Sequence, residues 1–280
     1  MNAGFRTVLR KTLGVAAVAG SLILAGCASV NTTQSGAVGI DRTQYMSSLV
    51  PEQELAQEAG QQYTDIIQKA RAQGALDRDA KQVARVRAVS QRLIAQVGTF
   101  RPDAANWQWE VHVLSLDELN AWCMPGGKIA VYTGLLSQIN PTDAELAAVL
   151  GHEISHALRE HARERVSQQM VTNVGLSVLS IATGVPADLG SKLTDVMFTL
   201  PNSRTHETEA DLMGVELAAR AGYDPRAAVT LWQKMGAADK GSAPPEFMST
   251  HPSASTRISE LQSASQRVMP LYEQAGGKGK

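Results

Sequence analysis

The stretch VLGHEISHALREH, residues 149–161, holds three of the six histidines in this chain of 280 residues. His152 and His156 are four residues apart, so on a helix they project from the same face about one turn apart. At that spacing two imidazoles can share one metal ion. Glu153 lies roughly 100° around the helix from His152, where it can reach a water at the metal without binding the metal itself. The alternative is a charged helix face exposed to solvent.

The residues before this stretch predict where its helix begins. TDAE, residues 142–145, is a capping box with Thr142 as the N-cap and Glu145 three residues further on. The apolar run that follows predicts a helix continuing to about Arg165. His161 stands five residues after His156, or about 500° around that helix, so we expect it to face away from the metal and to be structural.

A catalytic zinc ion takes three protein ligands and leaves one position open. The helix predicted to open in SRTHETEADLMG, residues 203–214, offers Glu207 as the third ligand, with His206 ranked below it. Asp211 follows by four residues and can accept the free ring N–H of a ligand histidine, which fixes the tautomer. Glu209 points elsewhere and is interpreted as a solvated acid.

The first 26 residues have the layout of a secretory signal, with three basic residues before an apolar run from Leu13 to Ala25. That run is shorter than the roughly 18 residues of a membrane-spanning helix. LAGC, residues 24–27, resembles the lipobox of bacterial lipoproteins, which makes Cys27 the predicted lipidation site. Ala28 and Ser29 resemble an outer-membrane sorting signal. We therefore expect a protein that is lipid-anchored in the outer membrane and faces the periplasm.

Composition and pattern predict one globular domain. Residues 27–48 are rich in Ser, Thr, Gly and Asn and are expected to form a lipidated N-terminus and flexible tether. Residues 49–270 are the predicted domain, with 271–280 as a C-terminal tail. The formal net charge of −1 gives no reason to expect nucleic acid as a partner. Cys123 is interpreted as a buried small apolar residue.

The pattern along the domain predicts an α+β fold that is mostly helical. Helices are expected near residues 52–73 and 79–97, and WEVHVLS and GKIAVYT are expected to be neighbouring strands. Short helices are expected between Val171 and Leu200. A further helix should begin at Ser203 and end at Gly222, and the final helix should follow His251.

Four segments together resemble metallopeptidase family 48, the minigluzincins that include HtpX and the CAAX prenyl protease. They are NAWCMPGGKIAVYTGLL, GHEISHALREHARER, SRTHETEADLMG and STHPSASTRI, all within residues 44–261. The lipoprotein layout is most similar to the BepA and LoiP branch. The resemblance implies a zincin-like domain with a small sheet beside the HExxH helix, and one zinc ion held by His152, His156 and Glu207. It also implies Glu153 as base and Asp211 as support.

The same resemblance places His251 near the active site. There it could cap the zinc in the resting protein or stabilise the oxyanion; a histidine that only contacts backbone is the alternative. GGKIAVYT resembles the family's edge strand, on which an extended substrate would pair.

The predicted function is that of a zinc-dependent endopeptidase in the periplasm, acting on misfolded or unassembled envelope proteins. The alternative is an assembly factor or chaperone for outer-membrane proteins, in which cleavage is incidental.

Overall fold

The computed structural model describes residues 27–176, 189–238, 246–252 and 256–277; the predicted signal sequence lies outside these ranges. In chain order the elements are β1 (Cys27–Val30), β2 (Gln44–Ser47), α2 (Glu52–Ala72), α3 (Ala80–Ile94), two 3₁₀ turns (Val97–Thr99, Pro102–Asn106), β3 (Glu110–Leu114), β4 (Ala121–Met124), β5 (Lys128–Tyr132), α4 (Thr133–Gln138), α5 (Asp143–Leu158), α6 (His161–Leu176), α7 (Leu189–Thr194), a π-helical turn (Asp195–Thr199), α8 (Arg204–Arg220), α9 (Ala227–Ala238), α10 (Glu246–Thr250) and α11 (Arg257–Gln274).

A three-stranded sheet lies within this helical domain, in the order β3–β5–β4. The predicted pairing of WEVHVLS with GKIAVYT is confirmed, with His112 opposite Ala130. The two strands run parallel because β4, which the pattern did not predict, lies between them in sequence and pairs antiparallel with β5. GKIAVYT is therefore the central strand, and the expectation that it forms the edge is wrong. Strands β3 and β4 are the two edges, one on each side of β5.

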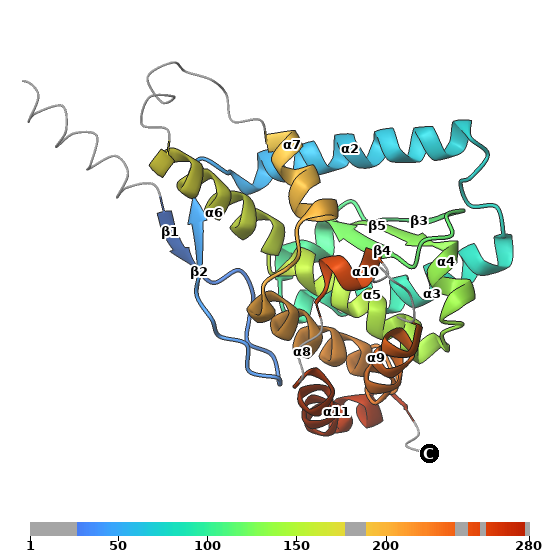
Figure 1. Ribbon diagram of the computed structural model, residues 1–280. Helices are drawn as coiled ribbons and strands as arrows, with labels where there is room; N and C mark the ends of the chain where they lie inside the picture. Colours follow the sequence, from blue (N-terminus) through green and yellow to red (C-terminus); the bar gives the residue numbers. More distant parts are fainter. Residues whose placement is uncertain (1–26, 177–188, 239–245, 253–255, 278–280) are drawn as a thin grey trace, which may run out of the picture.

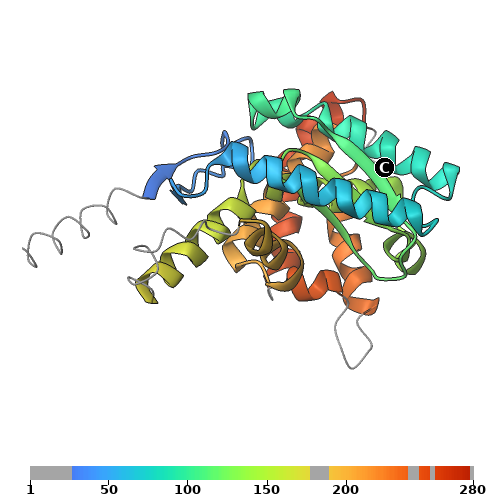
Figure 2. The ribbon, with the colours of Figure 1, turned by 90° about the horizontal axis from the view of Figure 1, so that it is seen from above.

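Helices cover both faces of this sheet (Figures 1 and 2). Tyr63 of α2 packs with Trp122 and Ala130 on one face, and its hydroxyl donates to the carbonyl of Ile129 at 2.8 Å. Residues of the opposite parity, such as Ile129 and Val131, belong to the larger core with α3 and α5. This alternation follows from strand geometry, in which successive side chains point to opposite faces. The expected mostly helical, zincin-like architecture is confirmed.

Helix α5 begins as predicted and ends earlier. Thr142 caps it, and both hydrogen bonds of the capping box with Glu145 are present. The predicted continuation to Arg165 is wrong, because α5 ends at Leu158 and the chain turns at Glu160, whose φ is +51°. Glu160 binds Arg101, which is distant in sequence, and Arg163, three residues further on, so one tertiary and one local ion pair hold the turn. His161 then begins α6.

Helices α5 and α8 touch through their backbones. A Cβ placed on Gly151 would lie 2.8 Å from the carbonyl oxygen of Gly214, and one on Gly214 would lie 2.7 Å from the backbone nitrogen of His152. Both distances are shorter than real Cβ contacts. The absence of a side chain at these two positions therefore permits the helix spacing.

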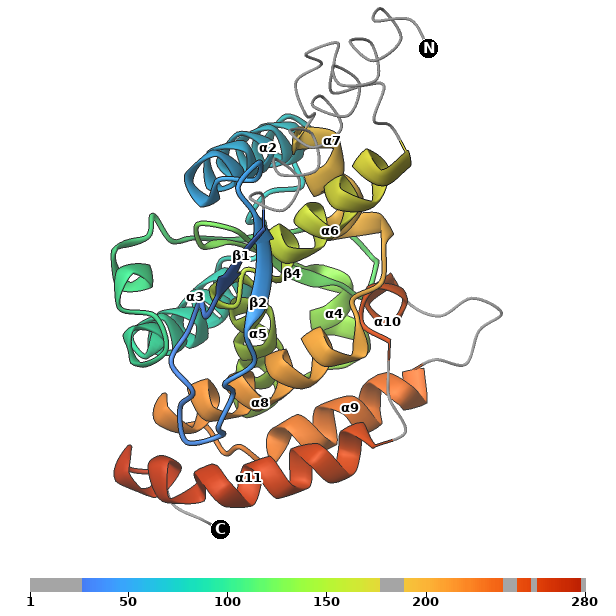
Figure 3. The same ribbon diagram turned by 90° about the vertical axis from the view of Figure 1, so that its left-hand side faces the viewer.

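Residues 31–47, which we call the strap, lie against the domain (Figure 3). Val38, Ile40 and Met46 are buried, and the backbone N–H of Val38 donates to Glu216 of α8 at 2.9 Å. The prediction of a flexible tether is wrong for this segment. Its polar composition conceals a few apolar side chains and Arg42, which bind the domain.

The end of the chain also differs from expectation. The predicted tail at 271–280 begins too early, because α11 continues to Gln274 and Tyr272 is buried. His251 does not open the final helix: it follows the short helix α10, and its backbone N–H donates to Phe247. Among the described residues, no helix has the length and apolar character needed to cross a bilayer.

Replacing Gly214 with alanine should destabilise the protein by about 1–3 kcal/mol, the usual range for overpacking, because the new methyl group meets backbone that cannot rotate away. Urea unfolding followed by circular dichroism measures this change. Gly60 of α2 is the matched control, because a Cβ there meets nothing within 4 Å. Gly60→Ala should stabilise by roughly 0.5–1 kcal/mol. Equal effects of the two substitutions would rule out the crossing as the cause.

Candidate metal centre and active site

Four side chains from three elements converge on one point. They are His152 and His156 of α5, Glu207 of α8 and His251 after α10; one ligand atom of each lies within 4.8 Å of the others. The Nε2 atoms of the two α5 histidines are 3.1 Å apart. They lie 3.6 Å and 3.4 Å from the carboxylate oxygens of Glu207. All four residues are buried.

This donor set fits zinc. With Zn–N distances near 2.0–2.1 Å, two ligands of a tetrahedral ion lie about 3.3 Å apart, which is close to the separations observed here. Among the described residues, neither carboxylate oxygen of Glu207 accepts a hydrogen bond, although both are buried and Arg257 Nη1 lies 3.1 Å from Oε2. Burying a carboxylate whose lone pairs are not satisfied is costly, so a cation between these ligands would lower that cost.

The histidines are held in the form that binds metal. Burial lowers the pKa of His152 and of His156 well below the ordinary value, so their rings are neutral at physiological pH. A neutral ring offers a lone pair to a metal ion, whereas an imidazolium does not.

Glu153 has the environment of a proton carrier. Burial, and then the nearby charge of Glu207, raises the pKa of Glu153 well above its usual range. Its Oε1 is buried, has no hydrogen-bond partner in the described part of the chain, and lies 3.5 Å from Nε2 of His251. A carboxyl group with a raised pKa can take a proton and return it, as general acid–base catalysis requires.

Asp211 lies where it was predicted to support a ligand. Its Oδ1 lies 2.9 Å from Nδ1 of His152, so Nδ1–H donates to it and Nε2 is left to face the metal. Burial raises the pKa of Asp211 to about 6, against the lowering effect of Arg257.

Arg257 is part of this site, although the sequence did not assign it a role. Its Nη2 donates to Asp211 at 2.7 Å, and Nη1 lies 3.1 Å from Glu207. The guanidinium carbon lies 3.2 Å from the ring centre of Trp232. The available signal was its position in STHPSASTRI, since a basic residue there can neutralise the acids of α8.

His251 lies beside both the cluster and the base. Besides the 3.5 Å approach of Nε2 to Glu153, its Nδ1 lies 3.0 Å from Thr250 Oγ1 and 3.2 Å from the carbonyl of Phe247. The ring therefore contacts backbone on one side while Nε2 faces the site. This position accommodates either role predicted for it.

Two expectations about neighbouring residues are wrong. His161 does not face away from the metal site, because the turn at Glu160 brings its Nδ1 to 2.8 Å from Nδ1 of His156. Glu209 is not solvated: it is buried and binds Arg42, Arg159 and His161. His206 stays outside the metal cluster and binds Glu164 at 3.1 Å.

A cavity of about 610 Å³ opens beside these residues. The cavity is lined by Glu153, His156 and His251, by three residues of β4 and by Asn120 just before it. The edge strand β4 therefore borders the active site. Cys123 is buried, and burial raises the pKa of its thiol, which agrees with its interpretation as a small apolar residue.

Comparison with known proteins agrees with this geometry. The model of peptidase family M48 matches residues 80–265. The chain therefore belongs to peptidase family M48, whose members are zinc metallopeptidases.

Individual relatives come from mitochondria and bacteria. The mitochondrial metalloendopeptidase OMA1 of Arabidopsis thaliana is 39% identical over 61% of this chain and 35% of its own length. The mitochondrial metalloendopeptidase OMA1 of Bos taurus is 35% identical over 70% of this chain and 40% of its own. The β-barrel assembly-enhancing protease of Escherichia coli is 29% identical over 58% of this chain and 36% of its own. The chain thus spans between about a third and a half of the curated relatives it matches.

Asp211→Asn should weaken zinc binding by about 10- to 100-fold without abolishing it, because groups that orient a ligand contribute about that much. Competition with a fluorescent zinc chelator measures the affinity. Glu207→Gln removes a ligand and should cause the larger loss. Equal losses of zinc affinity from the two variants would contradict the assignment of Glu207 as ligand and Asp211 as support.

Proposed function

We propose that this protein is a zinc-dependent endopeptidase that acts on misfolded or unassembled proteins of the cell envelope. The observation that carries the proposal is the buried carboxyl of Glu153, whose Oε1 has no hydrogen-bond partner among the described residues. It lies beside the metal-binding cluster, in a cavity bordered by strand β4. Structural zinc sites favour cysteine ligands and are closed, whereas this set contains a carboxylate and two imidazoles next to a candidate base.

Zinc, when bound by His152, His156 and Glu207, supplies Lewis acidity that polarises a carbonyl and lowers the pKa of water. Glu153 takes the proton from the attacking water and transfers it to the nitrogen of the leaving amine. The raised pKa of Glu153 lets it hold that proton between the two steps. Asp211 and Arg257 fix the orientation of His152 and Glu207 throughout.

The substrate is proposed to bind as an extended segment along β4. Strand β4 pairs with β5 along one edge, and residues 120–123 line the cavity beside the metal-binding cluster. Main-chain pairing at a strand edge recognises unfolded peptide with little dependence on sequence. Such binding suits removal of proteins that have failed to fold.

The envelope location is proposed from the N-terminal sequence. The signal-like residues 1–26 and the lipobox LAGC support a lipid on Cys27 and attachment to the outer membrane on its periplasmic side. Membrane fractionation of cells producing the protein, with and without the Cys27→Ser change, measures that attachment.

A second candidate is an assembly factor or chaperone for outer-membrane proteins that cleaves little; the name of the Escherichia coli relative, a β-barrel assembly-enhancing protease, supports the assembly part of this role. Such a factor would support barrel assembly equally well with or without the carboxyl of Glu153.

Glu153→Gln should keep the fold and the zinc. It should lower the rate of casein cleavage by about 10²- to 10⁴-fold or more, because general acid–base catalysis usually contributes that much. Zinc content by atomic absorption and cleavage rates should be measured side by side with the unchanged protein. Full activity in this variant would contradict the role of base.

His251→Ala separates the two roles proposed for this histidine. As a cap on the metal it restrains the resting protein, so its loss should raise basal cleavage of an unstructured substrate. As an oxyanion donor its loss should lower kcat by about 10²- to 10³-fold with little change in zinc content. We propose the cap; rates equal to those of the unchanged protein would exclude both roles.

A further inference from the structure

The two metal-binding histidines of α5 have different partners on their outer nitrogens. His152 meets a carboxylate directly, at Asp211. His156 instead meets another imidazole, since its Nδ1 lies 2.8 Å from Nδ1 of His161. Two ring nitrogens at this distance share one proton, so one donates and the other accepts. The question is which ring carries the proton.

The other nitrogen of His161 decides the matter. Its Nε2 lies 2.9 Å from Oε2 of Glu209, and a carboxylate can only accept. His161 therefore carries a proton on Nε2. The cluster places Nε2 of His156 at the metal position, so the one proton of the His156 ring is on Nδ1, and Nδ1 of His161 has to accept it. The proton between the two rings belongs to Nδ1 of His156, which leaves Nε2 of His156 with a free lone pair facing Glu207.

We propose that Glu209 and His161 are positioning residues that select the metal-binding tautomer of His156, through a chain of two hydrogen bonds. This inference deepens the proposed zinc site, on which it rests. Asp211 performs the same task for His152 in one hydrogen bond. The zinc site thus has a direct carboxylate support on one histidine and a support relayed through an imidazole on the other.

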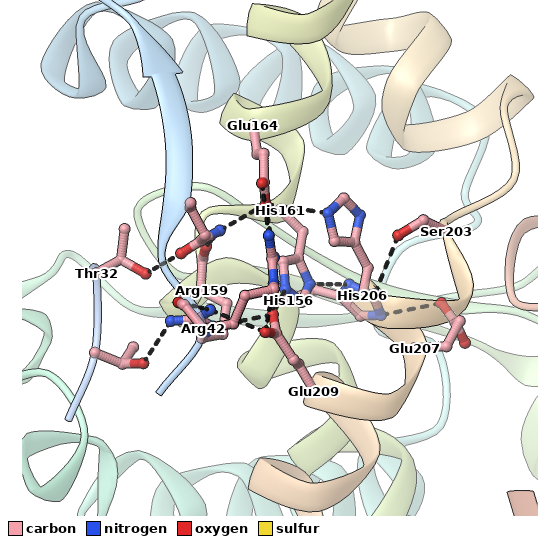
Figure 4. Close-up of polar contacts among 12 residues, drawn as sticks. Thr32, Arg42, His156, Arg159, His161, Glu164, Ser203, His206, Glu207 and Glu209 are labelled. Atoms are coloured by element: carbon pink, nitrogen blue, oxygen red, sulfur yellow. Dashed lines mark hydrogen bonds and ion pairs between the residues drawn. The ribbon is translucent and has the colours of Figure 1, made fainter. Parts of the chain in front are cut away.

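Arginines hold the relay carboxylate in place (Figure 4). Arg159, whose side chain has no exposed surface, donates to both oxygens of Glu209 at 3.2 Å and 3.1 Å. Arg42 of the strap also binds both oxygens, at 2.7 Å and 3.0 Å. With both oxygens fixed, Oε2 remains aimed at His161.

The strap thereby belongs to the support of the metal site. Arg159 donates to Thr33 Oγ1 and to the carbonyl of Arg42, both in the strap. The strap therefore supplies one of the two arginines that bind Glu209 and fixes the position of the other. Arg42 also makes two bonds of 2.8 Å to Glu164, which fixes its guanidinium between α6 and α8. A segment more than 100 residues before the metal ligands in sequence therefore orients one of them.

The decisive variant is His161→Phe, which keeps an aromatic ring of similar size and removes the acceptor for His156. Zinc affinity, measured by chelator competition, should fall by about 10- to 100-fold. His161→Asn returns an acceptor oxygen near the position of Nδ1 and should recover most of that loss. The matched control is His206→Phe: His206 is equally buried, stacks on His161 with ring centres 4.3 Å apart, and binds Glu164 instead of a metal ligand.

If the role is positioning, His206→Phe leaves zinc affinity within a few-fold of the unchanged protein, well short of the loss expected from removing a supporting residue. Equal losses from His161→Phe and His206→Phe, or no recovery in His161→Asn, would overturn the proposal. Because these readouts do not involve cleavage, failure of the endopeptidase function would be seen separately, as zinc binding without proteolysis.

A second measurement does not depend on any variant folding. In the zinc-loaded protein labelled with ¹⁵N at histidine, a proton covalently bound to Nδ1 of His156 should show a coupling across the hydrogen bond to Nδ1 of His161. Nε2 of His161 should also carry a proton. A proton found on Nδ1 of His161 instead would contradict the relay.

Discussion

The close contact of α5 with α8 is the constraint on which the site depends. Gly151 and Gly214 let the two backbones meet, and the metal ligands lie on either side of that contact. His152 is the next residue after Gly151, and Glu207 lies about two turns before Gly214 on α8. Because both helices are rigid, backbone contact fixes the separation of the ligands. The site is therefore largely formed before a metal binds, which is the condition for tight and selective binding.

The helix contact places many ionisable groups in a buried space, and the fold neutralises most of them in pairs. Arg257 forms ion pairs with Asp211 and Glu207, while Arg159 forms one with Glu209. Removing one member of such a pair is more damaging than lacking both, because the other stays buried and charged. Glu153 is the exception, because within the described part of the chain its Oε1 has no hydrogen-bond partner. This is the group that transfers the proton in the proposed chemistry.

The sequence predicted the parts of the site that depend on local helix geometry. The spacing of His152, His156 and Glu153 is a property of one helix, and the capping box located its start. The positions of Glu207 and Asp211 relative to them came from the resemblance to a family and from the four-residue spacing on α8. The structure brings these residues together at one buried site.

What the sequence could not predict depends on contacts between distant segments. Helical periodicity placed His161 on the wrong side because it could not foresee the turn at Glu160, which an ion pair with the distant Arg101 helps to hold. Strand β4 was missed because all four of its residues are buried, so it lacks the alternation that marks a half-exposed strand. The composition of the strap predicts a linker because it is polar on average, and the few side chains that contact the domain barely change that average.

The hairpin at the start of the described chain holds residue 27 close to the domain. A flexible linker of about 20 residues would let a domain roam roughly 25 Å from its attachment point. Here Cys27 instead pairs through its backbone with Ser47, and Ser47 is buried in the domain. A lipid on Cys27, as proposed, would bring the domain to the bilayer with almost no slack. The active site would then stay close to the membrane surface, and cleavage would be confined to segments of substrate that pass near it.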